Sequence, residues 1–108
     1  MTAGNKTEVL FEGKYLRLLR KGRWEFVERT RATGIVVLVA ITKAGELVLV
    51  EQLRPPVGKQ VIELPAGLVG DNAGSEDEPL EVAARRELLE ETGYEAGDLE
   101  LLTEGPIS

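Results

Sequence analysis

Alternating apolar and polar positions dominate the first third of the chain. Segments 8–13 (EVLFEG), 14–20 (KYLRLLR) and 23–29 (RWEFVER) are rich in leucine, β-branched and aromatic residues, and Lys21 and Gly22 separate the last two. Glycine and lysine suit a tight turn. The pattern therefore predicts antiparallel strands joined as a hairpin.

A near-continuous apolar run follows at 33–42 (TGIVVLVAIT). Such a run predicts a strand that is covered on both faces. The polar segment 43–46 (KAGE) predicts a turn, and 47–53 (LVLVEQL) is the expected antiparallel partner. Two prolines and a glycine in 54–60 (RPPVGKQ) then break the regular pattern.

The second half of the chain combines one short strand with one long helix. Segment 61–69 (VIELPAGLV) predicts a strand that runs into a Pro-Ala-Gly corner, and 70–79 is a polar loop. The pattern predicts a helix from about Pro79 to Thr92, with Asp77 or Glu78 as its cap and Gly93 as its end. Segment 99–102 (LELL) predicts one more strand.

These elements indicate an α+β fold. A strand-rich sheet with only one long helix leaves a sheet face uncovered, although domains bury such faces between layers. We therefore expect the fold to continue past Ser108 in a longer protein.

The composition narrows the chemistry. Among 108 residues, 43% are hydrophobic and 30% charged, which is typical of a folded domain. A net charge of -6 argues against nucleic-acid binding. Cysteine and histidine are absent, so thiolate and imidazole chemistry are excluded and carboxylates remain, which favour hard cations such as magnesium, manganese or calcium.

The sequence has no apolar stretch of the ~18 residues that a membrane helix needs, and the first residues lack the apolar core of a signal peptide. We expect a cytoplasmic protein without membrane contact.

Two glutamates in the predicted helix lie one turn apart. Because a helix turns ~100° per residue, Glu87 and Glu91 project about 40° apart, next to an apolar stripe of Leu80, Ala84 and Leu88. They could hold one metal ion at the edge of the buried face. They could equally be ordinary helix-forming residues on a solvated surface, and the helix alone favours neither interpretation.

The surrounding spacing resembles the box of the Nudix hydrolase family, G-x5-E-x7-R-E-U-x-E-E-x-G-U, where U is a bulky apolar residue. Its second part matches Glu78, seven further residues, and then 86–94 (RELLEETGY). Gly67 resembles the opening glycine, but ten residues rather than five separate it from Glu78. We interpret the difference as a five-residue insertion in the loop, which leaves the helix register unchanged.

The resemblance implies a Nudix fold, in which a mixed β-sheet is sandwiched by helices (α/β/α). It implies Mg²⁺ or Mn²⁺ bound by Glu87 and Glu91, with Glu90 as a further ligand or base. It also implies that Arg86 holds a glutamate of the box and that the backbone carbonyl of Ala66 is a metal ligand.

Segments 23–30 (RWEFVERT) and 51–69 (EQLRPPVGKQVIELPAGLV) resemble the ADP-ribose (ADP-sugar) pyrophosphatase branch of this family. In that branch, the residue at Trp24 stacks on adenine, often from the neighbouring subunit, and Glu25 and Arg29 shape the same pocket. Arg54 would meet the diphosphate or the terminal ribose, and Glu63 would lie near the substrate or metal.

Structural alternatives exist for these residues. Trp24 and Phe26 share one strand face, so the tryptophan could instead be a core or dimer-interface residue. Glu25 and Arg29 could form a surface pair, and Glu63 could lie on an exposed edge.

The expected reaction is metal-dependent hydrolysis of ADP-ribose to AMP and ribose 5-phosphate, with Glu90, Glu91 and Arg86 as catalytic residues. Alternatives are hydrolysis of another nucleoside diphosphate derivative and nucleotide binding without turnover. A base on a loop beyond Ser108 is possible in this branch, and Glu104 is a weak candidate here. We expect a homodimer, with 1–32 as an N-terminal dimerisation and adenine region and 33–108 as the Nudix domain.

Overall fold

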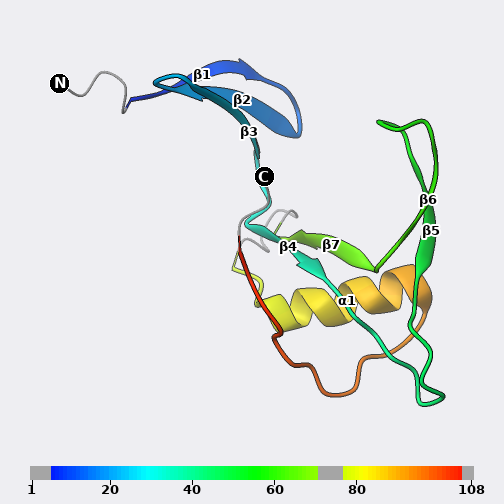
Figure 1. The fold of residues 1–108 in the computed structure, drawn as a ribbon. Helices are drawn as coiled ribbons and strands as arrows, with labels where there is room; N and C mark the ends of the chain where they lie inside the picture. The colour runs from blue at the N-terminus through cyan, green and yellow to red at the C-terminus, as the bar shows by residue number, and fades with distance from the viewer. Residues whose placement is uncertain (1–5, 71–76, 106–108) are drawn as a thin grey trace.

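The computed structural model describes residues 6–70 and 77–105, which form an N-terminal sheet, a two-stranded ladder, a hairpin and a helix (Figure 1). The insertion expected in the loop before the helix falls mainly on 71–76, outside the described residues.

The N-terminal sheet confirms the first sequence prediction. Its strands β1 (Thr7–Glu12), β2 (Leu16–Lys21) and β3 (Trp24–Arg29) pair antiparallel in the order β1-β2-β3. Gly22 has φ 60° in the turn between β2 and β3, a conformation that glycine adopts without strain. Every residue of β1 and β3 is exposed, so this sheet buries little apart from Leu19 of β2.

The predicted partner of the apolar run is confirmed only next to the turn. There, Thr42 donates its N–H to the Glu46 carbonyl and Val48 donates to the Ala40 carbonyl, both at 2.9 Å, and Ile41 bridges Leu47. The first part of the run, strand β4 (Gly34–Val37), instead pairs antiparallel with β7 (Ala66–Val69). Burial on both faces is also wrong, because Ile35 and Val37 are 44% and 57% exposed. An apolar run predicts a strand, but the partner depends on contacts that are distant in sequence.

The proline-containing segment forms a regular turn. Strands β5 (Val50–Arg54) and β6 (Lys59–Glu63) pair antiparallel, with Arg54 opposite Lys59. The turn Pro55–Gly58 closes this hairpin through N–H donation from Gly58 to the Arg54 carbonyl at 2.9 Å. The prolines lie outside the ladder, where a missing N–H costs nothing.

Helix α1 (Leu80–Thr92) confirms the predicted helix. Pro79 is the N-cap, without a side-chain cap, and Gly93 (φ 80°) ends the helix and donates its N–H to the Leu89 carbonyl at 2.9 Å. The helix packs on β7 and β4. Its buried residues are Ala83 and Leu88, whereas Leu80 of the expected apolar stripe is 48% exposed, because the ladder beneath the helix is only two strands wide.

The strand expected at 99–102 is wrong: the described residues after α1 contain no strand, and Leu101 and Leu102 are exposed. The described part is elongated, with extents of 59 × 32 × 26 Å and a radius of gyration of 17.0 Å, against roughly 13 Å for a compact domain of this length. Its strand pairs are all antiparallel. Among the described residues, no helix is long and apolar enough to cross a membrane.

Candidate active site

Arg86 connects the loop before the helix with the helix itself. Its Nε and Nη2 donate to the two carboxylate oxygens of Glu78 at 3.1 and 2.9 Å, and its Nη1 donates to Oε1 of Glu87 at 2.8 Å. Nη2 also approaches the carbonyl of Leu68 on β7, at 3.4 Å. The Arg86 guanidinium holds the pKa of the Glu78 carboxyl below its ordinary value, and the Glu78 carboxylate raises the pKa of Arg86.

This network explains why Glu78 does not cap the helix. Its carboxylate is already engaged by Arg86, and it accepts a further N–H from Gly70 at 3.4 Å. The fork of the guanidinium matches a carboxylate in two places at once, which a lysine could not do. Arg86 therefore fixes Glu87 relative to β7.

Glu87 lies directly against Gly67. A Cβ at Gly67 would overlap the Cγ, Cδ and Oε2 atoms of Glu87. The Glu87 side chain is only 13% exposed. Only glycine at this position of β7 leaves room for the carboxylate, so the first glycine of the box and its first helical glutamate are in direct contact.

Glu91 lies one helical turn after Glu87, at the edge of the same ladder. Its Oε2 accepts a hydrogen bond from Nε2 of Gln52 at 3.3 Å. Burial raises the pKa of Glu91, and the neighbouring Glu87 and Glu63 carboxylates raise it further, whereas the backbone N–H of Ala66 and the Arg54 guanidinium lower it. A half-buried carboxylate crowded by other carboxylates is stabilised by a cation, so the residues present fit a divalent metal ion.

The backbone at Ala66 is arranged to offer an oxygen. Leu38 donates its N–H to the Pro65 carbonyl at 2.8 Å, and Ala66 lies opposite Val37 in the next register position. Because antiparallel pairs alternate between hydrogen-bonded and non-hydrogen-bonded, the N–H and C=O of Ala66 point away from β4. The carbonyl predicted as a ligand thus has no partner in this ladder.

Glu90 lies on the Arg86 side of Glu87, because both carboxylates approach Nη1 of Arg86. Its side chain is exposed, and its Oε2 lies 3.7 Å from Nη1 of Arg86. Within 6–70 and 77–105, no three acidic side chains are grouped closely enough to hold one ion. The ligand roles of Glu87, Glu90 and Glu91 therefore stay predictions.

Arg54 and Glu63 are brought together by the β5–β6 hairpin. Nε of Arg54 donates to Oε2 of Glu63 at 2.7 Å, and Nη2 donates to Oε1. The hydrogen bonds from Arg54 lower the pKa of Glu63, and those to Glu63 raise the pKa of Arg54. The pair lies close enough to Glu91 for both charges to act on it.

The other predicted substrate residues lie on the N-terminal sheet, away from this cluster. Trp24 is 78% exposed, which is inconsistent with a core role in this chain. Glu25 pairs in register with Arg20, not with Arg29, and no ion pair joins Glu25 to Arg29 among the described residues. Trp24 and Arg29 are at opposite ends of β3, roughly 17 Å apart at strand spacing, so one chain does not bring them into one pocket.

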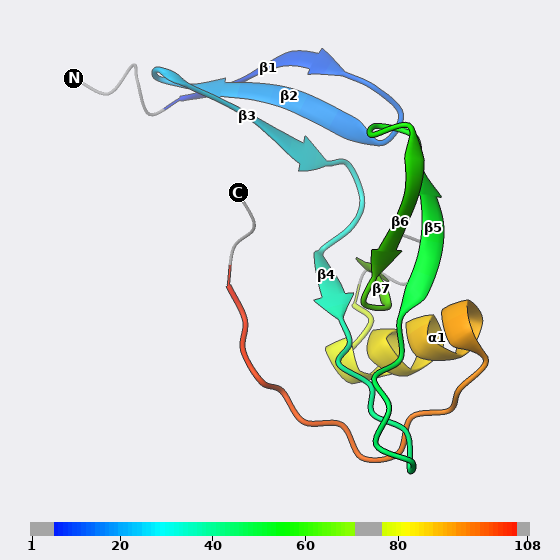
Figure 2. The same ribbon diagram turned by 45° about the vertical axis from the view of Figure 1, so that its right-hand side comes forward.

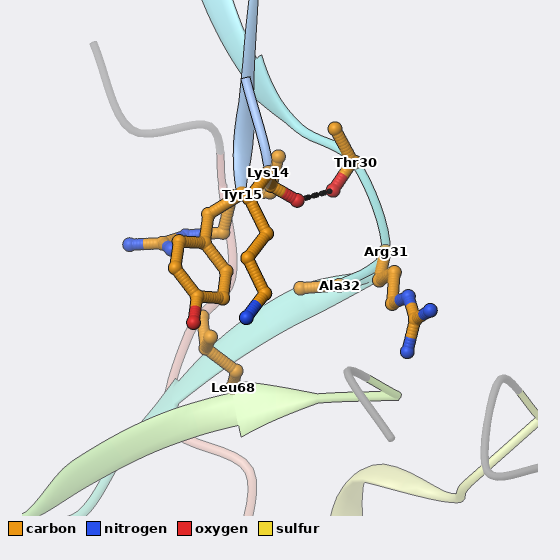
Figure 3. Close-up of a pocket in the computed structure, with 7 residues that line it drawn as sticks. Lys14, Tyr15, Thr30, Arg31, Ala32 and Leu68 are labelled. Atoms are coloured by element: carbon orange, nitrogen blue, oxygen red, sulfur yellow. Dashed lines mark hydrogen bonds between the residues drawn. The ribbon is translucent and has the colours of Figure 1, made fainter. Parts of the chain in front are cut away.

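Arg29 lines an open pocket of about 300 Å³ where the N-terminal sheet meets β7 (Figure 3). Lys14, Tyr15, Arg31 and Leu68 line it too, and the Lys14 ammonium lies 5.2 Å from the centre of the Tyr15 ring. In the described part of the chain, none of its three cations forms an ion pair. Sequence reasoning missed Lys14, Tyr15 and Arg31. The signal was three cations placed just before β2 begins and where β3 ends, which is the same end of the antiparallel sheet.

The chain is similar to known proteins over most of its length. The model of the NUDIX domain matches residues 28–106. The chain is 39% identical over 103 residues to a "Methanol dehydrogenase activator" of Bacillus methanolicus, covering 90% of this chain and 53% of that protein. It is 35% identical over 102 residues to an "ADP-ribose pyrophosphatase" of Bacillus subtilis, covering 89% and 52%.

An "ADP-sugar pyrophosphatase" of Mus musculus is 36% identical over 104 residues, covering 81% of this chain and 45% of that protein. The chain spans about half the length of these curated relatives.

Proposed function

Because the chain belongs to the Nudix family, we propose that it hydrolyses the diphosphate of ADP-ribose or a related ADP-sugar to AMP and a sugar phosphate, with Mg²⁺ or Mn²⁺ at Glu87 and Glu91. The observation that carries the proposal is that Glu87, packed against Gly67 and bonded to Arg86, lies one helical turn before half-buried Glu91. The Ala66 carbonyl has no partner in the β4–β7 ladder of the described residues. The names of the relatives from Bacillus subtilis and Mus musculus support this substrate class.

The chain's own residues prepare the site before substrate arrives. Arg86 fixes the Glu87 carboxylate, and Gly67 lets it approach β7. Glu91 accepts a hydrogen bond from Gln52, and the Ala66 amide favours its charged form. A bound divalent cation would neutralise charge on the diphosphate and lower the pKa of an attacking water. Glu90, exposed beside this pair, is the proposed proton acceptor or further ligand.

Substrate recognition is proposed for Arg54 and for the cationic pocket. Glu63 occupies Nε and Nη2 of Arg54, which leaves the Nη1 protons free for phosphate oxygens. Glu63 is proposed to stay near the substrate through this pairing. Lys14, Arg29 and Arg31 add local positive charge to a chain with net charge -6, which favours an anionic ligand.

We further propose a homodimer in which exposed Trp24, with Glu25 beside it, contributes to the adenine site of the partner. The supporting observation is that the N-terminal sheet carries large exposed apolar side chains, namely Trp24, Val27 and Phe11. The cytoplasmic location stays a prediction.

The test is AMP release from ADP-ribose with Mg²⁺, Mn²⁺ or a chelator, followed by chromatography. Glu91→Gln should lower kcat/KM at least about 100-fold, since it removes one charge where phosphate charge must be neutralised. Glu95→Gln, at an exposed position just past the helix, is the matched control. Calorimetric binding without product would instead identify a nucleotide-binding module, and faster turnover of GDP-mannose than of ADP-ribose would move the substrate to another nucleoside diphosphate.

A further inference from the structure

Gln52 is the residue of β5 whose side chain reaches helix α1. Its half-buried side chain donates from Nε2 to Oε2 of Glu91 at 3.3 Å. Because strand side chains alternate, Gln52 and Arg54 share one face of β5, roughly 7 Å apart along the strand. One strand face thus presents an amide to Glu91 and a guanidinium to Glu63.

Among the described residues, few other contacts hold the β5–β6 hairpin against the rest of the chain. Helix α1 packs on β7 and β4, whereas β5 and β6 pair with each other. Both views show the hairpin extending away from the last turns of α1, with only its base beside the helix (Figures 1 and 2). Within the described residues, Gln52 to Glu91 is the hydrogen bond that joins the hairpin to α1.

The chemistry of an amide suits this position. A glutamine N–H orients one oxygen of Glu91 without neutralising the carboxylate, so the charge stays available for a cation. A glutamate of the same length would repel Glu91, and a leucine of similar volume would leave the carboxylate oxygen without its donor. The contact therefore depends on the donor group and not on side-chain volume.

We propose that Gln52 is a positioning residue, which docks the β5–β6 hairpin on α1 through Glu91 and thereby aims Arg54 at the diphosphate. The inference rests on the proposed function for the identity of the substrate, but the docking itself does not. Without this contact, the hairpin would pivot about Leu64 and Pro65, where the chain passes into β7, and Arg54 would move relative to Glu87 and Glu91.

The docking is measured by a distance between two spin labels. The chain has no cysteine, so Val57→Cys at the hairpin turn and Val82→Cys on α1, both more than half exposed, label cleanly. Gln52→Leu and Gln52→Glu are compared with Glu51→Leu, which places the same leucine one residue away on the opposite face. Glu51 is exposed and forms no hydrogen bond among the described side chains.

Both Gln52 variants should broaden the distance distribution and lower kcat/KM for ADP-ribose about 10-fold, in the range of residues that orient metal ligands. Glu51→Leu should change neither. If Gln52→Leu fails to fold by circular dichroism, the isosteric Gln52→Glu provides both readings.

The inference would be overturned if the Gln52 variants gave distance distributions as narrow as that of the unsubstituted chain. It would also be overturned if their distributions broadened while kcat/KM stayed unchanged. In either case, AMP release by the wild type would still support the proposed function. Broadening in a chain that releases no AMP would support the docking and reject the proposed function.

Discussion

Gly67→Ala tests whether the contact between β7 and Glu87 organises the site. The added Cβ would occupy the space of the Glu87 carboxylate, so the side chain must rotate outward and give up its bond to Nη1 of Arg86. A charge-assisted hydrogen bond contributes about 1.5–3 kcal/mol. Renewed hydration of the carboxylate offsets part of it, which leaves a loss of about 1–2 kcal/mol.

For a domain of this size that loss corresponds to a decrease in the melting temperature of roughly 5 to 15 °C. The affinity for Mn²⁺ should fall about 10-fold or more, because the displaced carboxylate is a proposed ligand. Thermal unfolding followed by circular dichroism and a Mn²⁺ titration followed by electron paramagnetic resonance measure the two effects.

Gly34→Ala is the matched control, since it lies in the same ladder and its added Cβ would meet nothing within 4 Å. It should change stability by less than about 0.5 kcal/mol. In a double-mutant cycle, Gly67→Ala should cost little in a Glu87→Ala background, with a coupling energy of about 1–2 kcal/mol. Additive effects of the two substitutions would refute the assigned clash.

Three further outcomes follow from the charges at the site. Metal-free Glu91→Gln should melt higher than wild type at neutral pH, because the raised pKa of Glu91 means that ionising it destabilises the fold; the difference should shrink as pH falls through the raised pKa and be gone below the ordinary carboxyl pKa, and a wild type that is more stable at pH 7 would contradict this. Glu78→Gln should lower the urea midpoint at neutral pH, and this loss should fade as pH falls below about 4.5 through the depressed pKa of Glu78; a pH-independent loss would assign the role to packing. A hundredfold excess of Mn²⁺ over its Kd should stabilise wild type by about 2.7 kcal/mol in differential scanning calorimetry, and an equal gain in Glu87→Gln would exclude Glu87 as a ligand.

The sequence predicted the local elements well where their signals are local. The meander of β1 to β3 and the helix that ends at Gly93 follow from alternation, turn residues and a C-terminal glycine. It failed on the pairing of β4 and on the expected strand at 99–102. An apolar run indicates that a segment is extended, but it does not indicate which strand will pair with that segment.

For the site, the spacing from Glu78 to Glu91 pointed to the family, which the NUDIX domain match confirms. It also predicted the site residues, because helical geometry places Glu87 and Glu91 one turn apart whatever the rest of the fold does. The spacing could not show that Glu78 would be held by Arg86 rather than cap the helix. It also could not show that Arg54 and Glu63 would pair, or that Gln52 would meet Glu91, since 39 residues separate the last two in sequence.

The sequence by itself thus determined which groups are present: several carboxylates on one helix, and neither thiol nor imidazole in these 108 residues. Only the tertiary structure decided which groups surround those carboxylates, because β7 and the β5–β6 hairpin approach α1 from distant parts of the chain. Burial and neighbouring charges set the pKa of Glu91 through that approach, and no local pattern encodes either of them.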